Sequence, residues 1–404
     1  MSILLWGKVY YQDKYAGILR QEPGDRYVFT YDQDYLKNKY PVIANAFPLI
    51  NTSFIFEQSL PPFFDNLVAE GWLEAAQRKL LGRRAATRFE LLLAFGQECA
   101  GAVSVIDPKP VPLHTENIIK TDQATLALVR HRASLSGVQP KLLLVKEKKH
   151  FRLAKQGEIS THIAKLPSHT IDDIIDNEWL TLAAGRSLLP DDDFVETEFS
   201  DIPGICDKAL VIKRFDRTST GEKIHFEEFN QLLNLSAIEK YDGAYKAMAD
   251  FIYQHPLCLQ SDVYRLFKRV LMGLLLGNTD MHFKNFAMIH DAAGLRLSPN
   301  YDQVAAAIYK PYQYIALSID NAADRVIGQL KAKTIIALGY EFGLDKTAIT
   351  MAIDELYERL EATKEVILSA NEVHLSLRDR ISQFLERRWK GTFNLIGKQL
   401  SKKQ

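Results

Sequence analysis

The most informative stretch of the chain is Leu274–Ile289, LLLGNTDMHFKNFAMI, in which polar side chains crowd directly after an apolar run. Asp280 and Asn285 lie five positions apart in it, and Asp302 follows further along. Phosphoryl transfer needs a carboxylate that receives or orients a hydroxyl proton, together with oxygen ligands for a magnesium ion between the phosphates. The spacing therefore predicts that Asp280 acts on a hydroxyl group and that Asn285 and Asp302 bind Mg²⁺.

The order of these residues is that of protein kinases, which place an Asp, an Asn five positions later and a second Asp after a short hairpin. FAMI, the turn DAAG and LRLSP predict such a hairpin between Asn285 and Asp302. Asp and Asn also form turn hydrogen bonds at helix ends, which leaves a purely structural role open for this pair. We place His282 in the catalytic loop, where it is expected to support Asp280 rather than to bind a metal.

The elements that position these residues are readable from local patterns. In SDVYRLFKRVLMGLLLG the apolar residues recur with the spacing of one helix face, with Ser261 as the expected N-cap and Gly277 as the expected stop. The runs WGKVYYQDKYAGILR and RYVFTY predict short antiparallel strands, and KLLLVKEKKHFRLAK predicts a hairpin. From residue 250 onwards the chain is expected to be mostly helical, except for residues 286–302.

A kinase also needs a positively charged side chain on a strand to bind the ATP phosphates, and this side chain is usually paired with a carboxylate from a helix. Lys165 in the strand-like THIAKLP and Glu178 in the helix-like DNEWLTLAAG match this requirement. A lysine on an edge strand is ordinarily solvated, so the pair has meaning only beside the Asp–Asn–Asp series. VIKRFDR predicts a strand that runs into an adenine-binding hinge; the alternative is a buried strand whose Arg and Asp form a salt bridge.

The segment SLSGVQPK, which leads into a strand, has the small residues of a phosphate-cradling loop. It lacks a GxGxxG repeat, and an ordinary turn is the alternative. The predicted nucleotide contacts of this loop, the strands, the helix and the hinge are Ser136, Gly137, Val138, Gln139, Lys141, Lys165, Glu178, Lys213, Arg214 and Phe215.

The bulk properties indicate a globular protein with more than one folding unit. Of the 404 residues, 47% are hydrophobic, and 50 basic residues balance 50 acidic ones, which gives no support for a nucleic-acid or membrane surface. The three cysteines lie far apart without a CxxC pair, so no zinc site is predicted and a reducing compartment is favoured. No signal peptide or membrane span is predicted, and we expect a cytoplasmic location.

Seven motifs in sequence carry a family resemblance: SLSGVQPK, THIAKLP, DNEW, VIKRFDR, HFEEFNQ, GNTDMHFKNF and NYDQVAA. In this order they resemble HipA-like serine/threonine protein kinases, the toxin half of bacterial toxin–antitoxin pairs. The resemblance implies an α+β, bilobed protein-kinase-like fold with a strand-rich N-terminal subdomain and a mostly helical C-terminal lobe. The expected domains are an accessory subdomain (1–107), a connector (108–132), an ATP-binding lobe core (133–235) and a helical lobe with the catalytic loop and metal-binding hairpin (236–404).

The resemblance also implies roles and partners. The Asp–Asn–Asp series resembles the family's catalytic aspartate and magnesium ligands, and Lys165 resembles its ATP-phosphate lysine, so ATP and Mg²⁺ are the implied cofactors. In the family a serine of the phosphate loop is autophosphorylated and the kinase is thereby shut down; Ser134 takes its position, and Ser136 is a second candidate. The implied partners are a helix-turn-helix antitoxin, through which DNA is mainly contacted, and an aminoacyl-tRNA synthetase as substrate.

Two alternatives of different kinds remain open. Phosphoinositide-type lipid kinases also use an Asp-x-His-x-x-Asn loop, which Asp280, His282 and Asn285 fit; the sequence shows no basic membrane-facing patch near this loop that would favour them. A non-catalytic binding module with a kinase-like fold is the second alternative. The joint presence of Lys165 and the Asp–Asn–Asp series argues against such a decayed kinase.

Overall fold

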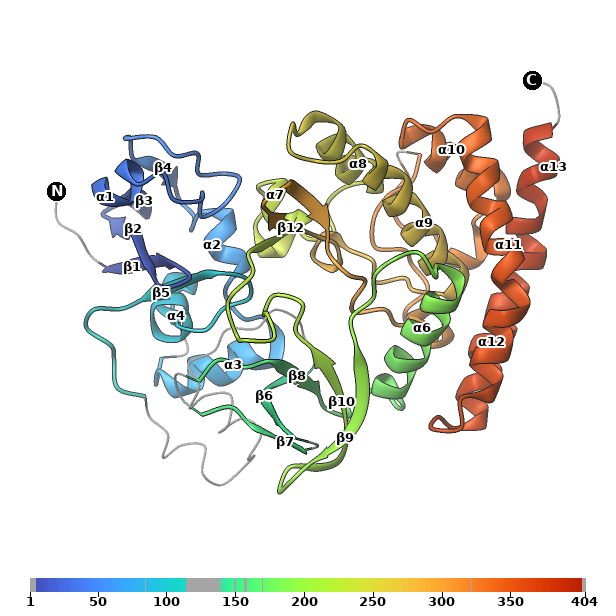
Figure 1. Cartoon of the computed structure of the whole chain (residues 1–404), viewed down its shortest axis with the longest axis horizontal. Coiled ribbons are helices and arrows are strands. Elements are labelled where there is room, and N and C mark those ends of the chain that lie inside the picture. The colour runs from blue at the N-terminus through green and yellow to red at the C-terminus, as the bar shows by residue number, and fades with distance from the viewer. Residues whose placement is uncertain are drawn as a thin grey trace. The chain divides into compact units, whose positions relative to one another are not determined.

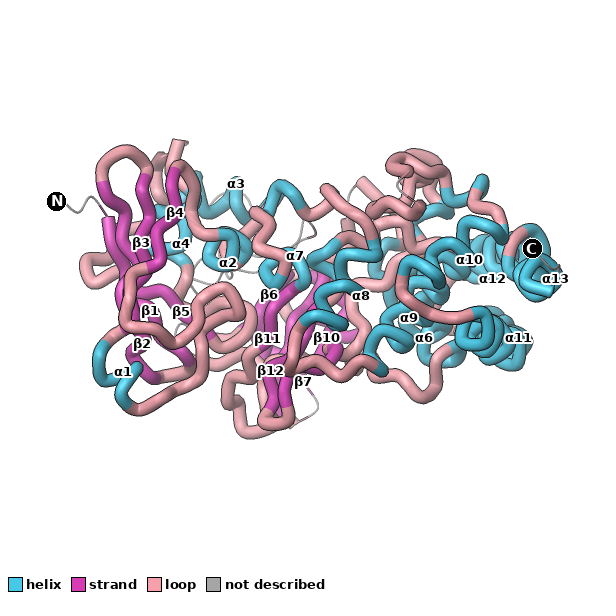
Figure 2. Tube along the Cα trace, turned by 90° about the horizontal axis from the view of Figure 1, so that it is seen from above, coloured by secondary structure: helices cyan, strands magenta, loops and turns pink. Residues whose placement is uncertain are grey.

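The chain folds into two compact units, each built from two separate stretches of sequence. The computed structural model describes residues 5–83, 85–113, 139, 141–148, 150–155, 158–168, 170–320 and 322–401. The first unit comprises Met1–Ser168 and Thr197–Ile238, and the second comprises His169–Glu196 and Glu239–Gln404. Figure 1 labels the elements along the chain, and Figure 2 shows the strand-rich part and the mostly helical part by colour.

The first unit opens with an antiparallel five-stranded sheet in the order β4-β3-β2-β1-β5. This confirms the short antiparallel strands predicted from the aromatic and branched residues of this region. Phe29 of β3 is fully buried and contacts Phe47 edge to face and Phe64 in a tilted ring pair, which forms an aromatic core. The elements are β1 (Leu5–Tyr11), β2 (Lys14–Glu22), β3 (Arg26–Tyr31), α1 (Gln33–Lys37), β4 (Phe54–Glu57), α2 (Pro62–Asn66), α3 (Gly71–Leu80), α4 (Arg88–Phe95) and β5 (Val103–Ile106).

A second five-stranded sheet of the first unit has the order β7-β6-β8-β10-β9. β6 and β7 pair antiparallel, which confirms the predicted hairpin, and β8 lies between β6 and β10. Leu73 of α3 packs in the same apolar cluster as Leu142, Ala164 and Val211 of this sheet. The strands of this sheet are β6 (Lys141–Glu147), β7 (His150–Leu153), β8 (His162–Lys165), β9 (Thr197–Ile202) and β10 (Cys206–Lys213). The first unit also contains β11 (Phe226–Glu228), outside this sheet, and α7 (Phe229–Leu232).

The second unit is mostly helical, as predicted, and its exception is the hairpin formed by β12 (Ala287–Asp291) and β13 (Gly294–Leu297), which pair antiparallel. No helix in the described part of the chain is both long enough and apolar enough to cross a membrane. The helices are α6 (Ile174–Leu188), α8 (Tyr245–Gln254), α9 (Ser261–Leu276), α10 (Ala332–Glu341), α11 (Lys346–Ser369), α12 (Leu375–Gly391) and α13 (Ile396–Ser401), with 3-10 turns at η2 (Ala237–Glu239), η3 (Phe283–Asn285), η4 (Ala306–Ile308), η5 (Ile327–Gln329) and η6 (Phe393–Leu395).

The two ends of α9 differ in how well local signals predicted them. Gly277 ends the helix in the left-handed conformation, at φ 91°, as expected of a glycine stop. The predicted N-cap at Ser261 is wrong, because the N-cap is Gln260 and Ser261 lies inside the helix. Asp262 and Val263 already donate their N–H groups to the carbonyls of Leu259 and Gln260, so the chain turns before it reaches Ser261.

The division into two units groups α6 with the second unit, although its residues fall in the range 133–235 that the sequence assigns to the ATP-binding core. Buried Asn177 of α6 explains part of this grouping. Its Oδ1 accepts a hydrogen bond from the backbone N–H of Ala305 at 2.8 Å, within the second unit. The four sequence ranges stay a prediction about the finer domain organisation.

Candidate active site

The loop between α9 and β12 presents one exposed residue from an otherwise buried segment. Among residues 271–288, all of which the structure describes, Asp280 alone is exposed. The loop is tied to the following chain at its start, where the carbonyl of Gly277 accepts the N–H of Ala307 at 2.9 Å and Thr279 Oγ1 donates to the carbonyl of Tyr312 at 2.9 Å. The packing therefore holds the loop backbone in place and leaves the carboxylate of Asp280 accessible.

Hydrogen bonds within the loop link Asp280 to Asn285. The Nδ2 of Asn285 donates to the carbonyl of Asp280 at 2.7 Å, and the backbone N–H of Asp280 donates to Oδ1 of Asn278 at 3.0 Å. Turn hydrogen bonds are therefore present, as the structural alternative expected, but they use the backbone of Asp280. Its side-chain Oδ1 accepts a hydrogen bond from the hydroxyl of Tyr241 at 2.9 Å.

His282 lies beside this aspartate, buried in the loop. Its ring meets the ring of Tyr241 edge to face, with centroids 5.0 Å apart. Because Tyr241 in turn bonds Asp280, the contact places His282 in the group of residues around the carboxylate. Its predicted supporting role stays a prediction.

The segment that carries Asp302 is held to the same loop on both sides. The hydroxyl of Tyr301 donates to the carbonyl of Lys284 at 2.8 Å, and Oε1 of Gln303 accepts from Nδ2 of Asn278 at 3.0 Å. Asp302 itself has φ 54°, in the left-handed region that non-glycine residues rarely adopt. The structure therefore brings the chain around Asp302 to the loop that carries Asp280 and Asn285, as the predicted series of Asp, Asn and Asp requires.

A partly buried ion cluster supports this segment from the loop after α6. Asp192 accepts hydrogen bonds from Arg265 at 2.6 Å, and from Nε and Nη2 of Arg269 at 2.6 and 2.7 Å. Its Oδ2 also accepts from Nδ2 of Asn300 at 3.1 Å, two residues before Asp302. Burial by itself raises the pKa of Asp192, but the hydrogen bonds and charges of the two arginines outweigh burial and lower this pKa to about 2.

The lowered pKa predicts an acid-sensitive contribution to folding. A carboxyl group whose pKa is lower in the folded than in the unfolded state stabilises the fold above its unfolded pKa, near 3.8, and loses that contribution as the pH falls towards 2. We expect the difference in unfolding free energy between wild type and Asp192→Asn, measured by urea denaturation, to shrink by about 1 kcal/mol between pH 6 and pH 3. The neighbouring Asp191→Asn should track wild type at both values, and an unchanged gap for Asp192→Asn would contradict the prediction.

The predicted nucleotide residues divide between the two units. In the first unit Lys165 ends β8, is only 4% exposed, and lies opposite Lys141 of β6. Gln139 donates its Nε2 to the carbonyl of Leu166 at 2.9 Å, next to Lys165. In the second unit Glu178 of α6 is fully buried. Four predicted residues lie outside the described residues: Ser134, Ser136, Gly137 and Val138.

The predicted hinge follows β10 in the first unit. Lys213 at the end of β10 is exposed, and Arg214 is buried. The ring of Phe215 packs on the ring of Phe226, with the two ring centroids 4.9 Å apart. The backbone N–H of Arg214 donates to the carbonyl of Thr161 at 3.0 Å. The predicted adenine contact of this segment stays a prediction.

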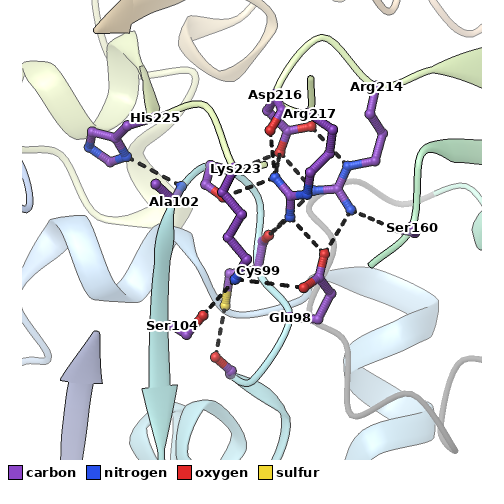
Figure 3. Close-up of polar contacts among 12 residues, drawn as sticks. Glu98, Cys99, Ala102, Ser104, Ser160, Arg214, Asp216, Arg217, Lys223 and His225 are labelled. Atoms are coloured by element: carbon purple, nitrogen blue, oxygen red, sulfur yellow. Dashed lines mark hydrogen bonds and ion pairs between the residues drawn. The ribbon is translucent and has the colours of Figure 1, made fainter. Parts of the chain in front are cut away.

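The side chain of Arg214 belongs to a buried ion network, shown in Figure 3. Its Nε and Nη2 donate to the two carboxylate oxygens of Asp216 at 2.8 and 2.7 Å, and its Nη1 donates to Glu98 at 3.2 Å and to Ser160 at 2.7 Å. Arg217 donates to Asp216 at 2.9 Å and to Glu98 at 2.7 Å. The arginines and the aspartate of VIKRFDR therefore form salt bridges with one another, as the structural alternative for this segment predicted.

Three residues near the site are not apparent from the sequence patterns: Tyr241, Asp192 and Glu98. Tyr241 contacts Asp280, Glu98 contacts Arg214, and Asp192 contacts Asn300, two residues before Asp302. Each comes from a distant position in the chain, so no local spacing reveals it. A weak signal exists for Tyr241, since KYDG combines an aromatic residue with turn residues.

Comparisons with known proteins match both parts of the chain to one family. Residues 7–106 match the HipA N-terminal domain, and residues 133–364 match the HipA-like C-terminal domain. The chain is 29% identical over 362 residues to the protein named Y4dM of Sinorhizobium fredii, covering 84% of this chain and 86% of the relative. It is 26% identical over 385 residues to the serine/threonine-protein kinase toxin HipA of Shewanella oneidensis, covering 85% of each.

A solved structure of the Shewanella oneidensis toxin–antitoxin system, with HipA, HipB and operator DNA, shares the fold. Its matched chain has a TM-score of 0.78 and 21% identity, covering 96% of this chain and 99% of that one. The α+β fold and the matched domains define a serine/threonine kinase. The chain belongs to the HipA-like family, which confirms the resemblance carried by the seven motifs. Kinase chemistry implies ATP and a metal ion.

Proposed function

We propose that this protein is an ATP- and Mg²⁺-dependent toxin kinase that phosphorylates an aminoacyl-tRNA synthetase on serine or threonine and thereby inhibits translation. The observation that carries the proposal is the catalytic loop, in which Asp280 is exposed on a buried and hydrogen-bonded backbone. A substrate hydroxyl can reach such a carboxylate, while the packing fixes the backbone that carries it. Positioning of this kind provides much of the rate enhancement in phosphoryl transfer.

Asn285 and Asp302 fit the oxygen-ligand chemistry of a magnesium site. The Nδ2 of Asn285 is bound to the carbonyl of Asp280. Because the amide nitrogen of Asn285 makes this hydrogen bond within the loop, the amide oxygen is the atom suited to bind a metal. Asp302 would add a carboxylate oxygen, and Mg²⁺ prefers oxygen ligands. Bound there, the metal would neutralise charge on the ATP phosphates.

In the first unit we assign the nucleotide phosphates to Lys165 and to the SLSGVQPK loop. Ser134 is the proposed autophosphorylation site, with Ser136 as the second candidate. A phosphoserine carries about two negative charges, which would repel the phosphates of ATP from a loop that binds them. Autophosphorylation would therefore switch the kinase off.

The proposed partner is a helix-turn-helix antitoxin, through which the pair contacts DNA. Two facts support this proposal: the structural relative is a complex of HipA with HipB and operator DNA, and the 50 basic residues of this chain are balanced by 50 acidic ones. A balanced chain lacks the excess positive charge typical of a DNA reader. The proposed location is the cytoplasm, where both partner and synthetase would be met.

Intact-mass analysis tests the kinase activity and its self-modification together. The dephosphorylated protein is incubated with Mg-ATP beside Asp280→Ala and a Ser134→Ala/Ser136→Ala double variant. We expect wild type to gain one or two phosphates that map to these serines, and neither variant to gain them. No gain in wild type would contradict autophosphorylation, and a gain in Asp280→Ala would contradict the role of Asp280.

The substrate class is tested in a cell extract freed of small molecules. The extract is incubated with Mg-ATP and either wild type or Asp280→Ala, and the charging of each tRNA family is then measured. We expect wild type to abolish charging of one tRNA family and to add phosphate to its synthetase. Full charging of every family together with phosphate on another protein would keep the kinase and reject the synthetase as target.

A further inference from the structure

A short turn before α8 packs directly on the catalytic loop. This KYDG segment, residues 240–243, lies in the same compact unit as the loop. The backbone N–H of Phe283 donates to the carbonyl of Lys240 at 3.2 Å. A Cβ atom added to Gly243 would lie 2.7 Å from the ring of Phe283, so only glycine allows this close approach. The turn and the loop are therefore fitted to each other by backbone as well as side-chain contacts.

Tyr241 makes the contact that matters for chemistry. Its hydroxyl donates to Oδ1 of Asp280 at 2.9 Å. The ring is held from two sides, by the edge-to-face contact with His282 and by Lys240, whose Nζ lies 5.5 Å from the ring centroid. The residue is nonetheless 46% exposed. A tyrosine at an accessible surface is thus anchored so that its hydroxyl meets the carboxylate that is proposed to act on the substrate.

Resting on the proposed function of Asp280, we infer that Tyr241 is a positioning residue of the kinase reaction. A carboxylate on a single exposed side chain can rotate, and a hydrogen bond to one oxygen limits that rotation. With Oδ1 held by Tyr241, the carboxylate keeps one orientation in which it meets an incoming serine or threonine hydroxyl. The tyrosine hydroxyl keeps its proton and transfers nothing. Its effect is to hold Asp280 in the orientation from which it accepts the substrate's hydrogen bond.

The competing account is that Tyr241 occupies the position of the acceptor hydroxyl and must leave before a substrate binds. Both accounts use the same hydrogen bond, but they predict opposite effects when the hydroxyl is removed. A positioning hydroxyl speeds the reaction, whereas a competing one slows it. The two contacts that hold the ring favour positioning, because neither depends on the hydroxyl group and both keep the side chain in place.

Tyr241→Phe is the decisive variant, since it keeps the ring contacts with His282 and Lys240 and removes one hydrogen bond. Tyr253→Phe is the matched control: Tyr253 lies on α8, is 39% exposed, and donates its hydroxyl to the carbonyl of Phe342 at 3.1 Å, away from the loop. The rate of ADP formation with Mg-ATP, which counts transfer to any acceptor, is measured across ATP concentrations. Thermal melting is measured in parallel.

We expect Tyr241→Phe to lower kcat about tenfold, the effect of one hydrogen bond to a charged group, with KM for ATP and melting temperature unchanged. Tyr253→Phe should keep the wild-type kcat. The Tyr241→Phe change should have no further effect in an Asp280→Asn background, since the carboxylate that Tyr241 is inferred to position is then absent. A kcat for Tyr241→Phe equal to or above wild type would overturn the inference. If Asp280→Asn itself keeps the wild-type rate, the proposed function of Asp280 fails instead, so the two failures are separable.

Discussion

Replacing Asp280 by asparagine is expected to lower the rate of phosphoryl transfer by about 10²- to 10⁴-fold, the usual contribution of a residue that takes a proton in the transition state. Asparagine has the same shape and can still accept the hydrogen bond from Tyr241, but its amide cannot receive the hydroxyl proton. The backbone groups of this position, which bond Asn278 and Asn285, are unaltered by the substitution. The loss should therefore appear in kcat, with unchanged ATP binding and unchanged melting temperature.

Asp291→Asn is the matched control for this substitution. Asp291 is an exposed aspartate at the end of β12, in the same unit, and its carboxylate accepts the N–H of Ala293 in the hairpin turn. Its replacement should leave the rate of ADP formation and of protein phosphorylation within about twofold of wild type, as expected of an exposed position away from the loop. Equal rates for Asp280→Asn and wild type would contradict a proton-accepting role for Asp280, whichever molecule is the acceptor.

Replacing Asp216 by asparagine is expected to destabilise the first unit by about 3–5 kcal/mol, the cost of removing one partner from a buried ion network. Two buried arginines, Arg214 and Arg217, both donate to this carboxylate, as does the backbone N–H of Gly101 at 2.8 Å. Burial by itself would raise the pKa of Asp216, but the charges and hydrogen bonds of the arginines lower it well below its ordinary range. The neutral amide would leave Glu98 as the remaining acid of the network shown in Figure 3.

A loss of this size is a large part of the stability of a typical domain, about 5–15 kcal/mol. It should be visible as an earlier urea transition in the fluorescence of Trp6 and Trp72, both in the first unit. Asp207→Asn, at an exposed position on strand β10, which precedes Asp216 in the chain, should change the unfolding free energy by less than about 0.5 kcal/mol. An Asp216→Asn protein as stable as wild type would show that the network contributes little to folding.

The ion network also has a consequence for the domain organisation. Glu98 comes from the chain just after α4, within the region that matches the HipA N-terminal domain, whereas Arg214 and Arg217 follow β10, within the region that matches the C-terminal domain. Glu98 lies more than one hundred positions before the two arginines in sequence, but the three residues form one buried cluster in the first unit. The N-terminal domain is thus joined to the predicted hinge by charged contacts that Asp216→Asn would weaken.

Local sequence patterns determined the elements around the catalytic loop because their causes are local. Helix α9 follows from the periodicity of its apolar residues, its end follows from the left-handed conformation of Gly277, and the β12–β13 hairpin follows from two short apolar runs around a turn. The order of Asp280, Asn285 and Asp302, together with the other motifs, likewise indicates phosphoryl transfer. These signals act between residues a few positions apart, which sequence displays directly.

Only the tertiary structure decided which distant side chains meet. Tyr241 reaches Asp280 across 39 positions, and Arg269 reaches Asp192 across 77. Such contacts depend on how whole elements pack, and a tyrosine or an arginine has the same local pattern whether it is solvated or bonded to a site residue. The start of α9 shows the same limit at short range, since the turn at Gln260 placed Ser261 inside the helix despite its suitability as a cap. The sequence by itself thus determined the class of chemistry, and packing determined which distant residues contact Asp280.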